Sequence, residues 1–373
     1  MGCLLCHSEE VTSILDMPPA PIWTNSPDDL TTNYRFSCRL NLCRRCGHIY
    51  QPVNDNLNQA LNAIYSSTQA QLSTSMTKGN WGKERGAAFM RVFLEMVDIK
   101  HHKSVFEIGC DDGYLLKILK DKGVKELAGI EPSLSQTIVK EGITLIKGFA
   151  NTETKLDKTF SLIFSSSVFE HIEDMNSIMD FCKAHLKENG QLYFDVPNAE
   201  FYIKDTDPAL FTHQHVHYFT DTSARQFMAA HGFEVVGITK DRDNLLVLSQ
   251  RSNDLSKSPV ALTGMDYQSR LIKNIEKLKS ILHKPKTIVH GVNNALNNVL
   301  AWTGEHFDFT LVDNDTTKHG KVFFGKTVSA LDKSDLKSYE QVIIAAHAFE
   351  DVIRKDYLMR GFTGDIIGIT HVA

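Results

Sequence analysis

The stretch VFEIGCDDGYLL, residues 105–116, decides the fold of this chain. An apolar run ends in glycine and acidic residues, and apolar residues at helical spacing begin directly after Gly113. This pattern predicts a strand, a tight turn and a helix start, which is the first βα unit of an open parallel sheet. Gly109 and Gly113 allow the backbone to approach a ligand where a Cβ would block it. The free N–H groups of the helix start then point into the crevice.

Acidic residues around this turn indicate the kind of ligand. The next predicted strand ends at Glu131, about 20 residues further on, where α/β folds place the acid that accepts hydrogen bonds from a ribose. The phosphate-binding pattern GxGxxG is absent, and Glu107, Asp111 and Asp112 would repel a pyrophosphate but suit an amino group. A nucleoside with a positive centre and no phosphate indicates S-adenosylmethionine (SAM). The alternative interpretation is an α/β turn whose acids are only solvated loop residues.

The cofactor is expected to contact residues at the ends of neighbouring strands. Glu131 should bind the ribose hydroxyls, while Glu107, Gly109 and Asp111 should frame the methionine end. The remaining expected cofactor-binding residues are Gly113, Pro132 and Ser166.

Length and charge restrict the class of protein. A chain of 373 residues predicts two or three domains, each able to bury a core. The net charge of −5 disfavours a nucleic-acid or anionic-membrane binder. No apolar run approaches the roughly 20 residues needed to span a bilayer, and the start MGCLLCHSEE does not have the pattern of a signal peptide. We therefore expect a cytoplasmic enzyme with a small-molecule substrate.

Four of the cysteines form two CxxC pairs. In a reducing compartment this spacing predicts one structural zinc ion held by four thiolates in a tetrahedron. Two local disulfides or a redox CxxC are the alternatives. His7 or His48 could replace a thiolate, although a complete set of four cysteines favours other roles for them. The predicted zinc ligands are Cys3, Cys6, Cys43 and Cys46.

The chain divides into three predicted parts: a zinc-binding domain (1–60), a core (61–252) and a smaller C-terminal α/β domain (253–373). Hydroxyl-rich segments at 65–67 and 73–76 would either cover the site or form a solvated linker. The core is expected to contain parallel strands separated by helices, closed by a hairpin that places an antiparallel strand at the sheet edge. The predicted core strands are Ser104–Ile108, Glu126–Ile130, Thr144–Ile146, Phe160–Ser165, Gln191–Val196, Phe233–Lys240 and Asn244–Gln250.

The predicted C-terminal domain begins after a charged helix at 266–283 and contains a small parallel sheet. Its turn, GVNNA at 291–295, contains too few glycines to indicate a dinucleotide-binding site. A docking domain is therefore as well supported as a binding domain. Its candidate ligand-facing residues are Asn293, Asn294, Asp313 and Lys318.

Two histidine-bearing stretches, residues 168–174 and 210–219, follow strands at the edge where ligands bind in such folds. Imidazole titrates near neutrality, so it can take a proton from a carbon or hydroxyl acid. His171 and His215 are the candidates because each lies in a stretch that follows a strand end. Alternatively, these are loop histidines packed against aromatic neighbours. A catalytic metal is disfavoured because alternate residues of HQHVH would not converge on one ion and the run contains no carboxylate.

Taken together, these motifs resemble the sugar C-methyltransferases of deoxysugar biosynthesis over essentially the full chain. The resemblance implies a four-cysteine zinc domain, a Rossmann-like class I methyltransferase core and a C-terminal α/β domain. It also implies a reaction on a nucleotide-linked 4-keto sugar, in which a base removes the proton beside the ketone and the enolate attacks the methyl group of SAM. The residues that carry the resemblance are CLLC with CRRC, EIGCDDGYLL, GIEPS at 129–133, EHIED and HQHVHYFT.

Carried over by position, His215 matches the general base of that family and His171 its active-site histidine. The family usually has a Tyr-x-Glu-His signature, and here Thr212 and Gln214 replace its tyrosine and glutamate. Because glutamine cannot stabilise an imidazolium by charge, the base is expected to be weaker. A different sugar, O-methylation of a sugar or other small acceptor, or a non-catalytic zinc-ribbon adaptor that binds SAM therefore remain alternatives.

Overall fold

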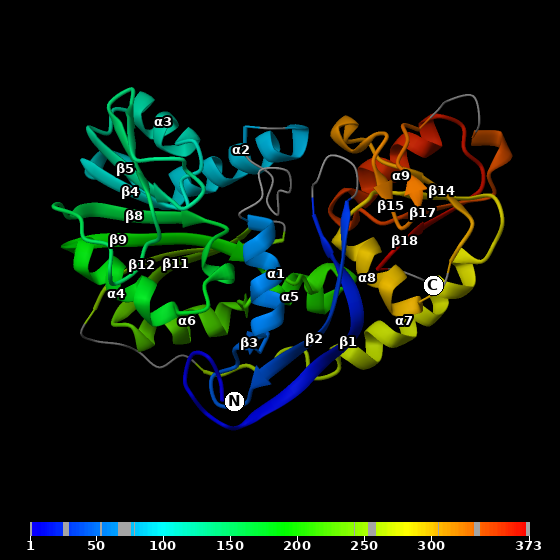
Figure 1. Ribbon diagram of the computed structural model, residues 1–373, viewed down its shortest axis with the longest axis horizontal. Helices are drawn as coiled ribbons and strands as arrows, with labels where there is room; N and C mark the ends of the chain where they lie inside the picture. The colour runs from blue at the N-terminus through cyan, green and yellow to red at the C-terminus, as the bar shows by residue number, and fades with distance from the viewer. Residues whose placement is uncertain are drawn as a thin grey trace.

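The computed structural model describes residues 2–24, 30–52, 54–65, 76–77, 79–241, 243–252, 259–304, 306–331 and 336–370, with the backbone alone at residues 32, 65 and 79–81. Two α/β units lie side by side, and a long N-terminal hairpin lies between and beneath them (Figure 1). Within the described residues, no helix is long and apolar enough to cross a membrane.

The larger unit is built on an eight-stranded sheet in the order β11-β12-β9-β8-β4-β5-β7-β6. The strands β9, β8, β4, β5 and β7 are parallel, and β4 lies in the middle with every residue buried. This order confirms the predicted Rossmann-like sheet of the core. The strands are β4 (Ser104–Ile108), β5 (Glu126–Glu131), β6 (Ile138–Lys140), β7 (Ile143–Lys147), β8 (Phe160–Ser166), β9 (Leu186–Pro197), β11 (Phe233–Asp241) and β12 (Asn244–Arg251).

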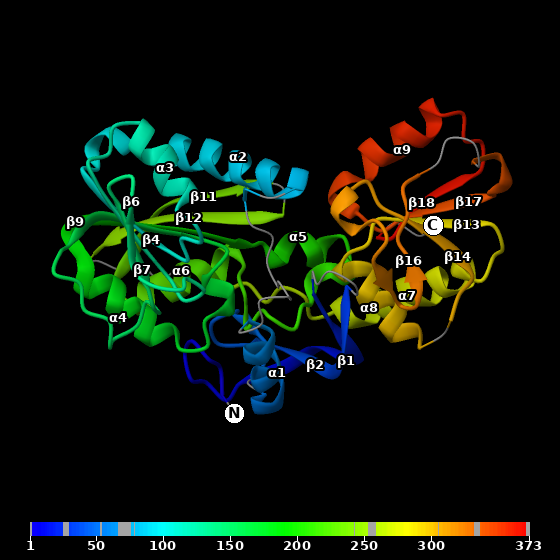
Figure 2. The ribbon, with the colours of Figure 1, turned by 45° about the horizontal axis from the view of Figure 1, so that its top comes forward.

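Helices cover both faces of this sheet, so the unit has three layers (Figure 2). One face packs α2 (Gly79–Met96) and α3 (Tyr114–Asp121) against the sheet. The other face packs α4 (Met175–His185) and α6 (Asp221–Ala230). Adjacent residues of β4 divide between the two cores, because Val105 faces α3 and Phe106 faces α4.

Two features of this sheet differ from the sequence prediction. No helix occurs in residues 132–159, all of which are described, and β6 forms a hairpin with β7 instead. Its two-residue loop places Glu141 and Gly142 at φ 51° and 76°, which is typical of a hairpin turn with two left-handed residues. The antiparallel strand of the closing hairpin is also not at the edge, since β12 lies between β9 and β11.

The N-terminal sheet has the order β1-β2-β3-β10. It comprises β1 (Val11–Trp23), β2 (Thr31–Cys43), β3 (Ile49–Tyr50) and β10 (His217–Tyr218), and α1 (Asp55–Tyr65) follows β3. Its fourth strand therefore comes from the second histidine stretch of the core. The two long strands, which the sequence pattern did not predict, bury Ile14, Leu15 and Leu40 in a core shared with Leu296 of α8 (Asn294–Thr303).

The C-terminal unit contains a four-stranded parallel sheet in the order β14-β13-β17-β18, which confirms the predicted small parallel sheet. The buried face of α7 (Tyr267–Leu282) joins it to the hairpin core. The short helix α5 (Ala199–Lys204) of the core also packs there. The remaining elements are β13 (Thr287–His290), β14 (Phe309–Val312), β15 (Val322–Phe323), β16 (Lys326–Thr327), β17 (Gln341–Ile344), α9 (Glu350–Met359) and β18 (Asp365–Gly368).

Candidate active site

The turn after β4 is shaped by two glycines with left-handed backbone, Gly109 at φ 76° and Gly113 at φ 82°. A Cβ on Gly109 would lie 2.4 Å from the side chain of Val168, so a neighbouring loop also requires this glycine. The N–H groups of Gly109 and Cys110 both donate to the carbonyl of Ile130, at 2.9 and 3.2 Å. These bonds hold the turn against the end of β5.

Glu131 lies at the end of β5 beside this turn. Its carboxylate accepts hydrogen bonds from the N–H groups of Asp111 at 3.4 Å and Ser133 at 2.9 Å. Asp111 has a left-handed φ of 46°, which aspartate tolerates better than most residues. Pro132 is exposed directly beyond Glu131.

Glu107 is the buried acid of this edge, with 2% of its surface exposed. Burial raises the pKa of its carboxyl well above the ordinary value, and the charges of Asp111 and Glu131 raise it further. One of its oxygens has no hydrogen-bond partner among the described residues. A positive ligand group would relieve the repulsion between these acids. The carboxyl groups of Glu107 and Asp111 therefore fit the amino and sulfonium end of SAM, and Glu131 is available for the ribose.

The structure thus brings Glu107, Gly109, Asp111 and Glu131 to one edge of the sheet, and Ser166 is buried nearby at the end of β8. Gly113 is the N-cap of α3, and a Cβ there would lie 3.1 Å from the side chain of Leu145.

His171 and His215 lie together in the folded chain although they are far apart in the sequence. Their rings are 4.8 Å apart and nearly perpendicular, at 77°. Nδ1 of His171 lies 3.0 Å from the carbonyl of Gln214, so this nitrogen carries the proton and Nε2 keeps its lone pair. Burial lowers the pKa of His171 to about 4. Burial and the charge of His171 lower the pKa of His215 well below its ordinary value.

The other two histidines of HQHVH point to other partners. Nε2 of His213 lies 3.2 Å from the carbonyl of Phe36, and Nε2 of His217 lies 2.9 Å from the carbonyl of Ile172. The three alternate histidines therefore do not converge, as the sequence interpretation held. Gln51 holds the HQHVH segment in place, since its side-chain amide donates to the carbonyl of His213 at 3.2 Å.

Two buried carboxyl groups at this edge were missed by the sequence reasoning. Glu170 is 1% exposed, lies 3.8 Å from Nε2 of His171, and has a pKa that burial raises to about 8. Asp195, at the end of β9, accepts from the N–H of Ser167 at 3.2 Å, and burial raises its pKa to about 6. The available signal was their position: Glu170 follows the end of β8 by four residues, and Asp195 lies two residues before the end of β9.

The four cysteines of the CxxC pairs meet in one cluster, with all sulfurs within 4.8 Å of one another. The nearest pairs join the two knuckles: Cys3 to Cys46 at 3.6 Å and Cys6 to Cys43 at 3.5 Å. A tetrahedral zinc ion with Zn–S bonds of about 2.3 Å separates its sulfurs by about 3.8 Å, so this cluster fits one zinc ion. All four thiols are free, which argues against two local disulfides.

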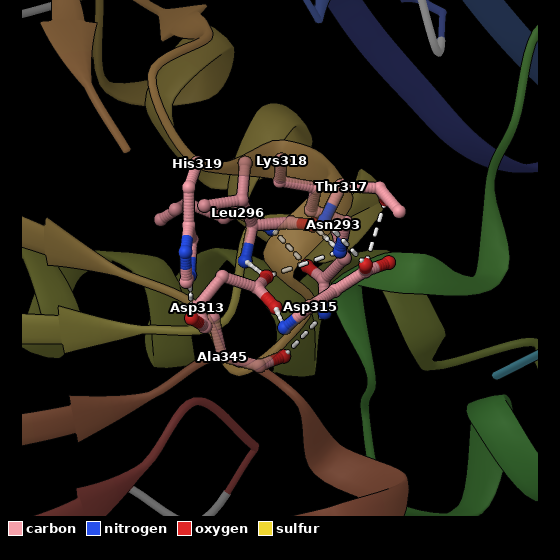
Figure 3. Close-up of polar contacts among 9 residues, drawn as sticks. Asn293, Leu296, Asp313, Asp315, Thr317, Lys318, His319 and Ala345 are labelled. Carbon is pink, nitrogen blue, oxygen red and sulfur yellow. Dashed lines mark hydrogen bonds and ion pairs between the residues drawn. The ribbon is translucent and has the colours of Figure 1, made fainter. Parts of the chain in front are cut away.

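The candidate residues of the C-terminal unit form hydrogen bonds with one another or with neighbouring backbone groups (Figure 3). Asn293 caps α8 through the N–H of Leu296 and donates to the carbonyl of Ala345 at 2.9 Å. The carboxylate of Asp313 accepts from Lys318 Nζ at 3.0 Å and from the N–H of Val292 at 2.7 Å.

Asn294 and Asn298 of α8 both donate to the carbonyl of Phe211 in the core. These two hydrogen bonds hold α8 against the core.

The strand order and the acid-lined turn define the class I methyltransferase fold. Residues 81–238 match a family model described as a methyltransferase domain. The chain is 21% identical over 251 residues to the C-methyltransferase NovU of Streptomyces niveus, covering 63% of this chain and 56% of that protein. It is 28% identical over 112 residues to a ubiquinone biosynthesis O-methyltransferase of Histophilus somni, covering 26% and 47%. The chain thus spans about half the length of the curated relatives it matches.

A solved structure of a putative SAM-dependent methyltransferase from Listeria monocytogenes superposes with a TM-score of 0.38 at 13% identity, covering 45% of this chain and 100% of the other. On the family match and the strand order, residues 81–238 form a methyltransferase domain with the class I fold.

Proposed function

We propose that this protein methylates a nucleotide-linked keto sugar at the carbon beside the ketone, with SAM as methyl donor and His215 as general base. The observation that carries the proposal is the pairing of His171 and His215, with rings 4.8 Å apart, in the loops that follow β8 and β9. β8 pairs with β4, whose end carries the turn with Glu107 and Asp111, and β9 pairs with β8 on its other side. The similarity to a C-methyltransferase supports this choice.

Bound SAM would supply an electrophilic methyl group. Glu131 would bind the ribose hydroxyls, and Glu107 with Asp111 would neutralise the amino group. His215 is neutral at working pH because burial lowers its pKa, so it can accept a proton. The backbone carbonyl of Gln214 fixes the tautomer of His171, which leaves its Nε2 free to accept a hydrogen bond from the substrate.

The weak basicity of this pair restricts the acceptor. Gln214 supplies no charge to stabilise an imidazolium, and burial disfavours the charged form further. The proton that is removed must therefore be acidic, and a C–H bond beside a carbonyl meets this need. An acidic hydroxyl would meet it too, so O-methylation of a sugar or another small acceptor is the second candidate. The similarity to an O-methyltransferase supports it.

We also propose that the four-cysteine cluster holds a structural zinc ion, and that residues 1–60, 61–252 and 253–373 are the zinc-binding, catalytic and C-terminal parts of a protein that acts in the cytoplasm.

A product assay with isotope-labelled SAM and a panel of nucleotide sugars tests the function. We expect labelled product from a 4-keto sugar, with mass spectrometry placing the methyl group on carbon. A methyl group on oxygen would select the second candidate. Calorimetric binding of SAM without turnover of any acceptor would instead indicate a non-catalytic adaptor, and absence of SAM binding would refute the proposal.

A further inference from the structure

Glu170, His171 and His215 form a second cluster of metal-ligating groups, separate from the cysteines. One donor atom from each lies within 4.8 Å of the others. Neither carboxylate oxygen of Glu170 has a hydrogen-bond partner among the described residues, although the residue is only 1% exposed. A buried carboxylate without a partner is costly, and a cation between these three groups would provide one.

The surroundings of His171 are those of a metal ligand. Its Nδ1–H donates to the carbonyl of Gln214 at 3.0 Å, and a carbonyl partner behind the ring is the usual arrangement of metal-bound histidines. Its Nε2 is thereby left with a lone pair, 3.8 Å from Glu170. The two loops are also joined through the backbone, because the N–H of Val216 donates to the carbonyl of Glu170 at 2.8 Å.

The sequence argument against a metal considered the HQHVH run alone. In the folded chain the missing carboxylate comes from the other loop, through Glu170. Two imidazole nitrogens and one carboxylate oxygen form a donor set that suits zinc-class ions and leaves a fourth position open. The side chain of His171 is 25% exposed, so an ion has access to the cluster.

We propose that Glu170, His171 and His215 bind a divalent ion of the zinc class, and that the bound ion inhibits methyl transfer. Coordination uses the imidazole lone pairs that proton acceptance requires, so the ion and the transferred proton exclude one another. The inhibition rests on the proposed role of His215 as general base, whereas the binding does not.

Cobalt titration tests the binding. The full-length protein is first loaded with one equivalent of zinc, and Co²⁺ is then followed by its visible absorption. We expect one further equivalent to bind without thiolate charge-transfer bands, because the new ligands contain no sulfur. Binding that shows these bands, or no saturable binding, would overturn the proposal.

Variants identify the ligands. Glu170→Gln keeps the side-chain shape and should weaken Co²⁺ binding by at least about tenfold. Changing a residue that only hydrogen-bonds to a metal ligand already costs about this much affinity, and Glu170 is proposed to be a ligand itself. His215→Ala, at a half-buried position, should do the same. The matched control is Glu173→Gln, which alters an exposed carboxylate three residues from Glu170 and should bind like the parent. Circular dichroism verifies that each variant is folded, and equal affinity in all variants would refute the site.

Activity separates the two proposals. Micromolar Zn²⁺ should inhibit transfer in the parent protein, and a chelator too weak to remove the structural zinc should reverse the effect. If Co²⁺ binds at the cluster but metal leaves turnover unchanged, the inhibition fails and so does the role of His215. If no acceptor is methylated, the cobalt titration still decides whether the site exists.

Discussion

His48 and His217 form a buried hydrogen bond, with Nε2 of His48 2.9 Å from Nδ1 of His217. His48 follows the second cysteine knuckle, and His217 lies two residues after His215. The bond therefore joins the cysteine cluster to the loop that carries the proposed base. Neither ring is more than 1% exposed.

We expect His48→Ala to lower the free energy of unfolding by roughly 2–4 kcal/mol, because it leaves a cavity and an unpartnered His217 nitrogen. Urea unfolding measures the loss. The control is His7→Asn, which changes an exposed histidine at φ 56° to a residue that tolerates this backbone. Equal stability of the two variants would show that the bond does not fasten the loop.

Cys43→Ser should abolish zinc binding and unfold the N-terminal sheet, since structural zinc supplies folding energy to so small a unit. Elemental analysis of the parent protein should give about one equivalent of zinc. Cys38→Ala, at a buried cysteine outside the cluster, should keep the metal. Recovery of a folded parent protein that is free of metal would contradict this prediction.

Glu131→Ala should weaken SAM binding by roughly tenfold to a hundredfold, the equivalent of one or two hydrogen bonds to a charged group. Isothermal calorimetry gives the affinity. Glu126→Ala is the matched control, because this exposed glutamate is the first residue of the strand that Glu131 ends. An unchanged affinity in Glu131→Ala would remove the ribose contact from the proposed site.

His215→Ala should abolish turnover and leave SAM affinity within about threefold, which is less than ~1 kcal/mol. The reason is that the residue is proposed to act on the acceptor and not on the cofactor. Calorimetry and the labelled-product assay measure the two effects separately. Substantial remaining turnover would reject the role of general base.

The contacts of His347 predict that the free energy of unfolding depends on pH. Its Nδ1 lies 2.8 Å from Asp207 and its Nε2 3.7 Å from Asp205, while Glu350 adds negative charge and the Phe201 ring stacks on it. The hydrogen bond with Asp207 raises the pKa of His347. A raised pKa in the folded state stabilises the protein below the unfolded value of ~6.5, and this contribution is lost as the pH rises through the folded value.

His347→Gln should therefore lower the free energy of unfolding by roughly 1–2 kcal/mol in mildly acidic buffer and by much less in mildly alkaline buffer. Urea unfolding at both pH values measures the difference. A loss that is the same at both values would mean that the charge of His347 does not contribute.

Local pattern was sufficient to predict the centre of the core. The apolar run ending at Ile108 and the leucine spacing after Gly113 specify β4 and α3 without distant partners. The β6–β7 hairpin was missed because its signal is a single Glu141-Gly142 turn within a polar stretch.

Partners distant in sequence could not be predicted. Glu170 approaches His215 only because strands β8 and β9 end at the same edge of the sheet. The pairing of β3 with β10 likewise follows from the packing of the whole chain, so no local pattern indicated it. The hydroxyl-rich segments proposed as a cover for the site lie largely outside the described residues.

The pairing of β3 with β10 also sets an order of events during synthesis. His48 must wait until a partner 169 residues further along has left the ribosome before the N-terminal sheet can close. Until then the cysteine knuckles and the exposed edge of β3 depend on metal or on chaperones for protection. Translation speed across the core is thus expected to influence how much of this protein reaches its native state.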